Sequence, residues 1–348
     1  MNVLVTGGAG FIGSHVAEHY AGKGDHVVVV DNLSRDRLLK GEPSKYREYN
    51  WNYLRDKYSN SIVFIHGDVR DKGLMESLAE DRDVIIHTAA QTAVTASLTD
   101  PRTDFEVNLL GTFNVLEAAR KSGRNPAVIF CSTNKVYGDN VNAIKVRTLP
   151  KRYVFNSACI PEQFPIDHCE HTPYGCSKLA ADLYVQDYAR RNEIKAGVFR
   201  MSCIYGDRQF GVEDQGWVSW FAVATLQGNP ITIYGDGKQV RDILYVSDLV
   251  RAFDQFVKKS ENLKYGVFNM GGGPGNTISL LELIDMLEAY TGKRSEVTFA
   301  GWRDSDQKVY VSDIRKAQKT LGWSPEITPL VGVKRLVEWL QEHEICLQ

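Results

Sequence analysis

The chain has 348 residues, 43% of them hydrophobic, which allows one large or two ordinary globular domains. Its formal net charge is −2 and no pronounced basic run is present, so nucleic acid is excluded as an expected partner. Membrane association is not expected either, because no apolar run is long enough to span a bilayer and residues 1–5 resemble a strand rather than a signal peptide. The six cysteines lack paired CxxC spacing, which favours reduced thiols in a cytoplasmic protein.

A glycine-rich motif follows the first predicted strand. The sequence TGGAGFIG, residues 6–13, is followed by a predicted helix at residues 14–20. In this context Gly7 permits a tight turn, Gly10 lets the backbone approach a pyrophosphate and Gly13 lets the helix pack on the strand. Free N–H groups and the helix dipole favour phosphate at the helix N-terminus. The motif therefore predicts a dinucleotide site, with an ordinary glycine turn as the alternative.

The second predicted strand carries an acidic residue at its end. It spans residues 26–30 and leads directly into Asp31. A carboxylate at this position accepts the hydroxyls of the adenosine ribose and repels a 2′-phosphate, which favours NAD over NADP. Arg35 and Arg37 follow closely in the sequence and weaken this preference.

Three further strands are predicted, at residues 62–65, 84–87 and 127–131. Small or polar residues follow each of them, and a long helix containing Asn108 is predicted over residues 105–122. Because ligands of open α/β sheets bind at the carboxyl ends of the strands, we expect the residues after these strands to line a site.

Two long connections, residues 36–60 and 139–172, interrupt the pattern. Segments of this length carry function or interfaces, or form a surface excursion with its own small core. The second returns the chain to Tyr174, so we expect it to cover the substrate. Residues 168–171 and Cys176 contain histidine and cysteine, but their spacing matches no structural zinc pattern, and we predict no metal site.

Tyr174 and Lys178 lie at the start of a predicted helix that Pro173 opens. At positions i and i+4 they share one face of that helix. A lysine ammonium beside a phenol is expected to lower the phenol's pKa from about 10 toward neutrality. Such a phenol can take a proton from a sugar hydroxyl while hydride leaves the same carbon. A chance pair on a solvated helix face is the alternative, and the preceding dinucleotide motif argues against it.

The strand–helix alternation is lost after a sixth predicted strand at residues 195–200. Residues 231–248 resemble a hairpin followed by a return to the sheet, and the tail contains an amphipathic helix at residues 279–291 and a last helix at residues 330–343. We therefore predict an α/β protein: a doubly wound parallel-sheet Rossmann fold with a smaller mixed α/β substrate-binding domain. The Rossmann domain is expected to take residues 1–200 plus about 237–270, and the smaller domain residues 201–236 plus about 271–348.

Three arginines in the second half, Arg208, Arg241 and Arg303, lie in glycine- or turn-rich stretches rather than on helix faces. Because arginine forks bind phosphate bidentately, these residues are candidates for binding a diphosphate. Surface ion pairing is the alternative for each of them.

These features resemble the extended short-chain dehydrogenase/reductase family, whose members modify nucleotide-diphosphate sugars. The glycine motif, Asp31, Ser132 and the Tyr174/Lys178 pair carry the resemblance, which covers the whole chain. Within the family, further stretches are most similar to the CDP-paratose 2-epimerases, also called CDP-tyvelose 2-epimerases. They are residues 50–51, 132–139, 171–178, 207–211, 214–217, 235–242 and 305–307.

The resemblance implies an NAD-dependent epimerase that inverts C2 of a CDP-linked hexose, such as CDP-paratose. Hydride would pass from C2 to NAD, the 2-keto sugar would turn in the pocket, and hydride would return to the opposite face. The resemblance makes Tyr174 the base, Lys178 the residue that lowers its pKa and holds the nicotinamide ribose, and Ser132 the partner of the reacting hydroxyl. It further implies tightly bound NAD that is not consumed, and a homo-oligomer, either dimer or tetramer.

Motif and resemblance together define the expected binding residues. Those for the cofactor are Thr6, Gly7, Gly10, Phe11, Ile12, Gly13, Asp31, Asn32, Ser34, Arg35, Asp68, Val69, Ala89, Ala90, Gln91, Asn108, Tyr174 and Lys178. Those for the CDP-sugar are Ser132, Thr133, Asn134, Arg208, Gln209, Arg241, Arg303 and Asp306.

Three alternative functions remain on this scaffold. A 4-epimerase uses the same catalytic residues and differs only in pocket shape. A 4,6-dehydratase of the family carries Asp-Glu after the Ser/Thr pair, whereas this chain has Asn134 and Lys135, which cannot supply both an acid and a base. A dinucleotide-sensing regulator without activity commonly lacks the tyrosine or the lysine, and this chain keeps both.

Overall fold

The computed structural model describes residues 1–38, 46–155, 159–303 and 306–343. Parts of the two long connections, Ser305 and Cys346 lie outside these described residues. The chain divides into two compact units, each taken from several segments. Unit 1 comprises Met1–Val136, Thr172–Arg200 and Val250–Phe268, and unit 2 comprises Tyr137–His171, Met201–Leu249 and Asn269–Gln348.

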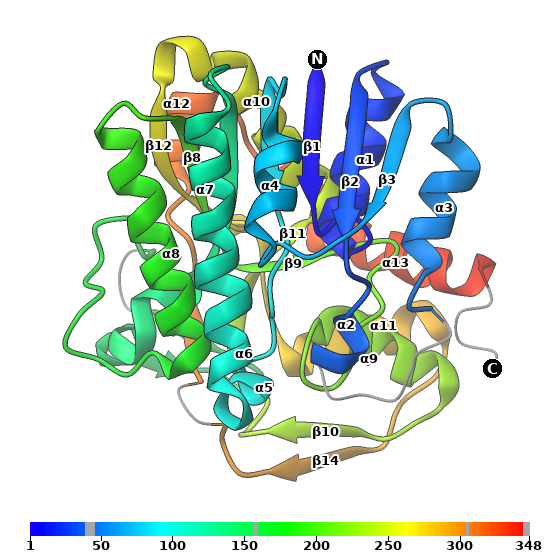
Figure 1. Cartoon of the computed structure of the whole chain (residues 1–348). Coiled ribbons are helices and arrows are strands. Elements are labelled where there is room, and N and C mark those ends of the chain that lie inside the picture. The colour runs from blue at the N-terminus through cyan, green and yellow to red at the C-terminus, as the bar shows by residue number, and fades with distance from the viewer. Residues whose placement is uncertain (39–45, 156–158, 304–305, 344–348) are drawn as a thin grey trace. The chain divides into compact units, whose positions relative to one another are not determined.

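Unit 1 is built on a seven-stranded sheet with the order β12-β8-β5-β4-β1-β2-β3 (Figure 1). The five strands from β5 to β3 pair in parallel. The side chains of β1, β2, β4 and β5 are mostly buried, as expected for a sheet covered on both faces, whereas the edge strand β3 is largely half-buried or exposed. The strands are β1 (Asn2–Thr6), β2 (His26–Asp31), β3 (Ile62–His66), β4 (Val84–His87), β5 (Ala127–Thr133), β8 (Lys195–Met201) and β12 (Tyr265–Met270). The strand order reverses between β1 and β4, so the predicted doubly wound Rossmann fold is confirmed.

Helices cover both faces of this sheet. On one face α4 (Lys72–Ala79), α7 (Gly111–Lys121) and α8 (Thr172–Arg190) lie side by side and share one hydrophobic core with the strands (Figure 1). On the other face α1 (Phe11–Gly22) is joined to α10 (Val246–Leu263) by an ion pair of 2.7 Å between Lys23 and Asp254. The sheet is thereby shielded on both sides, and its carboxyl-terminal edge remains the place where loops gather.

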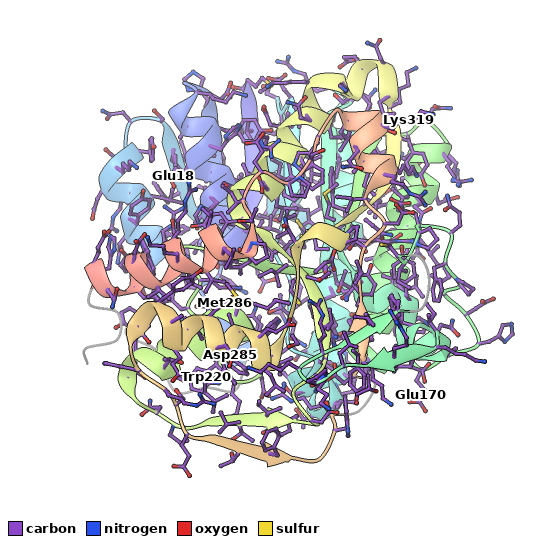
Figure 2. The ribbon with its side chains drawn as sticks, turned by 180° about the vertical axis from the view of Figure 1, so that it is seen from behind. Glu18, Glu170, Trp220, Asp285, Met286 and Lys319 are labelled. Atoms are coloured by element: carbon purple, nitrogen blue, oxygen red, sulfur yellow. The ribbon has the colours of Figure 1, made fainter. Side chains whose placement is uncertain are left out.

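The first long connection contains helix α3 (Tyr49–Tyr58), and α2 (Arg35–Leu38) precedes it. Helix α3 packs on α1 through Glu18, which Figure 2 labels: its carboxylate accepts hydrogen bonds from Tyr53 at 2.7 Å and from Lys57 at 2.8 Å. The ring of Trp51 packs against that of Phe64, with the two ring centres 4.9 Å apart. The described part of this connection therefore forms a small core of its own on unit 1.

The helix predicted over residues 105–122 is present, but a π-helical turn lies within it. The structure has α5 (Val94–Thr99) and α6 (Pro101–Phe105), then a π-helical turn, η1 (Glu106–Leu110), and then α7. Asp100 caps α6 by accepting the N–H of Thr103 at 3.1 Å. The π turn contains Asn108, whose side chain is held in a buried network, and such turns are frequent at functional sites.

Unit 2 has several small sheets. Strand β11 (Val240–Tyr245) pairs with β9 (Cys203–Tyr205), β13 (Thr277–Ser279) and β15 (Val309–Tyr310), whereas β10 (Ile231–Tyr234) pairs in parallel with β14 (Val297–Ala300). The hairpin predicted for residues 231–248 is therefore wrong. A parallel partner more than sixty residues away leaves no local signal, so the turn-rich stretch between β10 and β11 was a misleading hairpin cue.

The helices of unit 2 are α9 (Trp217–Gln227), α11 (Leu280–Thr291), α12 (Arg315–Leu321) and α13 (Pro329–Glu342). Helix α11 begins with a capping box formed by Ser279 and Glu282. Helices α9 and α11 pack against each other and lie side by side in both figures, where Trp220 marks α9 and Asp285 marks α11 in Figure 2.

The second long connection belongs to unit 2, although the sequence pattern groups it with the first domain. It contains η2 (Asn134–Ala143) and the strands β6 (Val146–Thr148) and β7 (Tyr153–Phe155). Backbone hydrogen bonds explain the grouping: Tyr153 donates to Lys238 at 2.9 Å and Ile160 donates to Val311 at 2.8 Å. The described part of this connection is thus bonded to residues that flank β11 and β15 of unit 2.

Among the described residues, no helix combines the length and the apolar character that crossing a membrane requires.

Candidate active site

The glycine turn forms the first part of the site, at the carboxyl end of β1. Gly7 has a φ of +71°, and its N–H donates to the carbonyl of Val30 at 2.8 Å. A Cβ at Gly7 would lie 2.6 Å from the backbone nitrogen of Ala89, and one at Gly13 would lie 2.2 Å from the carbonyl oxygen of Gly7. Neither position can hold a side chain, so the turn stays tight and α1 stays close to β1.

Helix α1 begins directly after this turn, at Phe11 and Ile12. Its N-cap residue is Gly10, which has no side chain to bond the N–H groups of the first turn. These groups and the helix dipole therefore suit the pyrophosphate of a dinucleotide. The residues of the turn fit NAD, and this fit rests on the shape of the backbone.

Asp31 connects the glycine turn to the end of β2. One carboxylate oxygen accepts the N–H of Ala9 at 3.0 Å and the other accepts the N–H of Leu33 at 2.8 Å. Each oxygen retains a lone pair that can accept a ribose hydroxyl. Burial raises the pKa of Asp31, while the hydrogen bonds from Leu33 and Ala9 oppose that rise.

Further predicted cofactor-binding residues gather at the neighbouring strand ends. Asn32 donates to Asp68 at 2.7 Å and accepts the N–H of Ser34 at 3.1 Å. Burial would raise the pKa of Asp68, but hydrogen bonds from Arg70 lower it to about 2. Of the remaining predicted contacts, Val69 is buried and Arg35 has its pKa lowered by burial.

Residues after β4 complete the cofactor side. Ala89 and Ala90 are small and half-buried, and the N–H of Ala89 lies 3.4 Å from the hydroxyl of Thr6. Gln91 and Asn108 bond each other: the Gln91 N–H donates to Asn108 Oδ1 at 2.9 Å, and Asn108 Nδ2 donates to the Gln91 carbonyl at 3.1 Å. The Asn108 side chain therefore supports the loop through the Gln91 backbone.

Tyr174 and Lys178 are both buried in the first turns of α8. The Tyr174 phenol is hydrogen-bonded to the side chain of Thr133, the last residue of β5. The Lys178 ammonium lies 4.3 Å from the centre of the Phe130 ring. The pair that the sequence predicts from its spacing thus lies at the carboxyl edge of the sheet, together with the end of β5.

The titration of this pair differs from the sequence prediction. Burial raises the pKa of Tyr174 to about 12, and the hydrogen bond from Thr133 opposes only part of that rise. Burial also lowers the pKa of Lys178 to about 8. The expected lowering of the phenol's pKa is therefore wrong for this structure, because the loss of solvation disfavours both charged forms.

Ser132 does not take the role that the sequence assigns to it. Its hydroxyl donates to Asp182 at 2.6 Å, and Asp182 is itself paired with Arg200 at 2.9 Å, deep in unit 1. Successive side chains of a strand point to opposite faces, so Ser132 and Thr133 cannot both reach Tyr174. Thr133, predicted only as a sugar contact, is the hydroxyl that meets the phenol, and the buried Asn134 follows it with its Oδ1 3.4 Å from the Thr133 hydroxyl.

Asp104 is a further buried residue of this region, and the sequence patterns did not point to it. It is buried and lies one helical turn before Asn108, to which it is hydrogen-bonded at 3.0 Å. The i, i+4 spacing from Asn108 was the available signal. It was too weak to use, because aspartate on a helix is ordinarily solvated.

The candidate diphosphate residues lie in unit 2, and each has acidic or aromatic neighbours. Arg241 pairs with Asp306 at 2.7 Å. Arg303 pairs with Asp214 at 3.0 Å and lies 4.1 Å from the centre of the Tyr234 ring. Binding of a diphosphate by Arg241 or Arg303 would therefore require an exchange of partners.

Two predicted substrate contacts, Arg208 and Gln209, are buried within unit 2. Arg208 has a φ of +60°, and Gln209 donates through Nε2 to the carbonyl of Ile204 at 3.1 Å. Around the histidine- and cysteine-containing segment, Cys169 lies 3.4 Å from His171 Nε2. No group of three or more histidine, cysteine, aspartate or glutamate residues suited to a metal ion occurs in the part of the chain that the structure describes.

The comparisons with known proteins agree with this geometry. The model of the NAD dependent epimerase/dehydratase family matches residues 3–271. The chain is 38% identical to the CDP-paratose 2-epimerase of Salmonella typhi, over 97% of this chain and 99% of that protein. It is 33% identical to a putative UDP-glucose 4-epimerase of Methanocaldococcus jannaschii, over 98% of this chain and 99% of that protein.

Among solved structures, the UDP-glucuronic acid 4-epimerase of Bacillus cereus in complex with UDP-glucuronic acid and NAD is similar, with a TM-score of 0.84 and 27% identity. The match covers 99% of this chain and 100% of that one. With the glycine turn, Asp31 and the Tyr174–Lys178 pair at one sheet edge, these matches establish that the chain belongs to the NAD-dependent epimerase/dehydratase family, the extended short-chain dehydrogenases/reductases.

Proposed function

We propose that this protein is an NAD-dependent epimerase that inverts C2 of a CDP-linked hexose such as CDP-paratose. The observation that carries the chemistry is the buried Tyr174 phenol, which is bonded to Thr133 and followed one turn later by Lys178. The similarity to a CDP-paratose 2-epimerase over almost the whole chain supports the choice of nucleotide and carbon.

Each residue of this arrangement has a defined task in the proposed reaction. Tyr174 takes the proton of the sugar hydroxyl at the reacting carbon and later returns it, and Thr133 fixes the phenol oxygen by its hydrogen bond. Lys178 in its ammonium form stabilises the phenolate that this proton transfer creates. NAD, when bound, supplies the acceptor and donor of hydride. Burial of all three side chains keeps water away from the phenol.

A 4-epimerase is the second candidate. It is favoured by the likeness to the UDP-sugar 4-epimerases described above, and it needs the same three residues. The choice between C2 and C4 depends on which hydroxyl lies next to Tyr174 and Thr133. A dehydratase is disfavoured because Asn134, which is buried, and Lys135 offer no carboxylate pair after Thr133.

A panel of CDP- and UDP-linked hexoses, followed by NMR in D₂O, tests the proposal. We expect CDP-paratose or a related CDP-hexose to invert at C2 without uptake of solvent deuterium, because hydride transfer keeps the migrating hydrogen out of water. Inversion at C4 would keep the chemistry and overturn the substrate. Stoichiometric deuterium at C2, or release of free CDP, would contradict the hydride mechanism and indicate elimination of the nucleotide instead.

We also propose that the protein is a homo-oligomer. Helices α6 to α8 of unit 1 present the large apolar side chains Phe105, Leu110, Phe113, Leu183 and Tyr184 with 36–53% of their surface exposed. Phe113 and Tyr184 already contact each other at 5.7 Å. A second copy of this chain is the proposed occupant of this surface. Light scattering of wild type and of the double variant Phe113→Ser, Leu183→Ser tests this: the wild type should be a dimer or tetramer and the variant a monomer, and a monomeric wild type would refute it.

A further inference from the structure

Asp104 is buried at the centre of a polar network in unit 1, and only 1% of its surface is exposed. One carboxylate oxygen accepts hydrogen bonds from Gln91 Nε2 at 2.9 Å and from Asn108 Nδ2 at 3.0 Å. The other accepts the hydroxyl of Ser177 at 2.5 Å. Because all three partners donate, the arrangement matches the ionised carboxylate, which can only accept. A negative charge is therefore enclosed next to the residue that precedes Lys178.

The network reaches both members of the catalytic pair through α8. The Ser177 hydroxyl also approaches the carbonyl of Tyr174 at 3.1 Å, and Ser177 is the direct neighbour of Lys178 in the chain. Asn108, in the π turn, donates through Nδ2 to the Ser177 hydroxyl oxygen at 3.2 Å. Asp104 thus fixes the first two turns of α8, where Tyr174 and Lys178 lie.

Several titratable groups face Lys178 from the elements packed around it. Burial raises the pKa of the Cys131 thiol on β5 to about 12, and burial lowers the pKa of His87 on β4 to about 3, so both are uncharged at neutral pH. Asp182 on α8 is charged but is paired with the buried Arg200. Burial raises the pKa of Asp104 itself, the hydrogen bond from Ser177 and the charge of Lys178 oppose that rise, and Asp100, the N-cap of α6, adds a smaller raising effect.

Asp104 differs from Asp182 in that its recorded hydrogen bonds among the described residues come from neutral donors only. Its charge acts on both members of the pair and raises the pKa of each, after the larger effect of burial. For Lys178 this influence opposes the loss of the proton that burial favours.

We propose that Asp104 is a positioning residue of the active site, whose buried negative charge keeps Lys178 in its ammonium form while its hydrogen bonds to Ser177 and Asn108 fix the start of α8. This inference rests on the proposed function only in that the proposed reaction requires Lys178 in its ammonium form. The charge effect itself is a property of the protein without substrate. Lys178 is the group through which Asp104 acts, and Asp104 itself touches no reacting atom.

The Asp104→Asn variant separates charge from shape. An asparagine has the same size, its carbonyl oxygen can still accept from Gln91 and Asn108, and its amide can donate to the Ser177 hydroxyl. The matched control is Ser177→Ala, which removes a hydrogen bond but leaves the charge. Protein labelled with ¹³Cε-lysine is titrated by NMR between about pH 6 and pH 10, and the Lys178 signal is assigned with Lys178→Arg. The NAD content and circular dichroism of each variant are measured alongside.

We expect the titration midpoint of Lys178 to fall by roughly half a pH unit to one unit in Asp104→Asn, as loss of a nearby opposite charge predicts. In Ser177→Ala it should move by less than about 0.2 units, since a neutral hydrogen bond is lost and no charge is removed. In Asp104→Glu, which keeps the charge, the midpoint should stay near the wild-type value. An unchanged midpoint in Asp104→Asn, or an equal shift in Ser177→Ala, would overturn the proposal.

Failure of this inference and failure of the proposed function can be told apart. The NMR titration needs no sugar, so it reports on Asp104 even if the substrate is wrong. Where CDP-paratose or another sugar is turned over, the pH dependence of kcat gives a second readout. The activity of Asp104→Asn should fall by less than about twofold at pH 7 but about three- to tenfold near pH 9, and recover in Asp104→Glu, because the fraction of Lys178 in the ammonium form follows its midpoint. An activity loss with an unchanged Lys178 midpoint would contradict the inference.

Discussion

Two carboxylates of unit 1, Asp182 and Asp104, are buried around the same helix but are compensated in different ways. Asp182 accepts a hydrogen bond from the Ser132 hydroxyl and forms an ion pair with Arg200, so its negative charge is compensated by an adjacent positive charge. Asp104 accepts only neutral donors among its recorded partners in the described residues. A buried charge that is paired serves mainly the integrity of the fold, whereas one that is hydrogen-bonded but unpaired acts on its titratable neighbours. The four predictions below test this difference, in order of decreasing effect.

The difference between the two carboxylates matters for catalysis only if Tyr174 and Lys178 perform the acid–base step. Replacement of Tyr174 by phenylalanine keeps the ring in its buried position but removes the group that takes the proton. Turnover should fall by about 10² to 10⁴, the usual range for loss of a general acid–base group. Steady-state kinetics on the identified substrate check this, with NAD content as the control. Activity within a few-fold of wild type would remove Tyr174 from the mechanism.

The two carboxylates should differ sharply in their effect on stability. Asp182→Ala removes the carboxylate that forms an ion pair with the buried Arg200, so the free energy of unfolding should fall by about 3 to 5 kcal/mol. Asp104→Asn retains its hydrogen bonds and should cost less than about 1 kcal/mol. Urea denaturation of both variants measures the difference. Equal losses would show that Asp104 serves the fold just as Asp182 does.

The pH dependence of stability provides a test at Lys178. Burial lowers its pKa from 10.5 to about 8, so the folded protein binds fewer protons than the unfolded chain between these values. The stability contributed by this group is therefore fully present above about pH 10.5 and is lost as the pH falls through about 8. The Lys178→Met variant has no ammonium group to bury, so it does not lose stability in this way as the pH falls. Its advantage over the wild type should shrink by about 1 to 3 kcal/mol as the pH rises from 8 toward 10.5. An advantage that does not change with pH would show that Lys178 does not titrate in this range.

The smallest effect is expected at the two neighbouring hydroxyls of β5. Thr133→Val removes the hydrogen bond to the Tyr174 phenol and should lower kcat about tenfold, which corresponds to one hydrogen bond of about 1.4 kcal/mol. Ser132→Ala removes a donor from Asp182 and should change stability more than kcat. Parallel measurement of kcat and unfolding distinguishes them. A larger loss of kcat in Ser132→Ala would restore the role that the sequence assigns to Ser132.

Short sequence motifs predicted those features of the protein that depend on residues close together in the chain. The glycine turn between β1 and α1, the acidic residue at the end of β2 and the i, i+4 spacing of Tyr174 and Lys178 are all readable within a few residues. They led to the Rossmann fold and to NAD, and both predictions are confirmed. The parallel pairing of β10 with β14 joins segments that are far apart in the chain. The sequence pattern instead predicted a hairpin there.

The sequence by itself determined the fold class, the cofactor and the helix that carries Tyr174 and Lys178, because strand periodicity, glycine requirements and helical spacing are local properties of the chain. Only the tertiary structure decided that Thr133 rather than Ser132 meets the phenol, since this depends on which face of β5 turns toward α8. It also decided that burial raises the pKa of Tyr174 and that Asp104 is enclosed near Lys178. Solvation and the distances between charges are set by segments that meet only in the folded protein, and this is the physical reason why no pattern in the sequence revealed them.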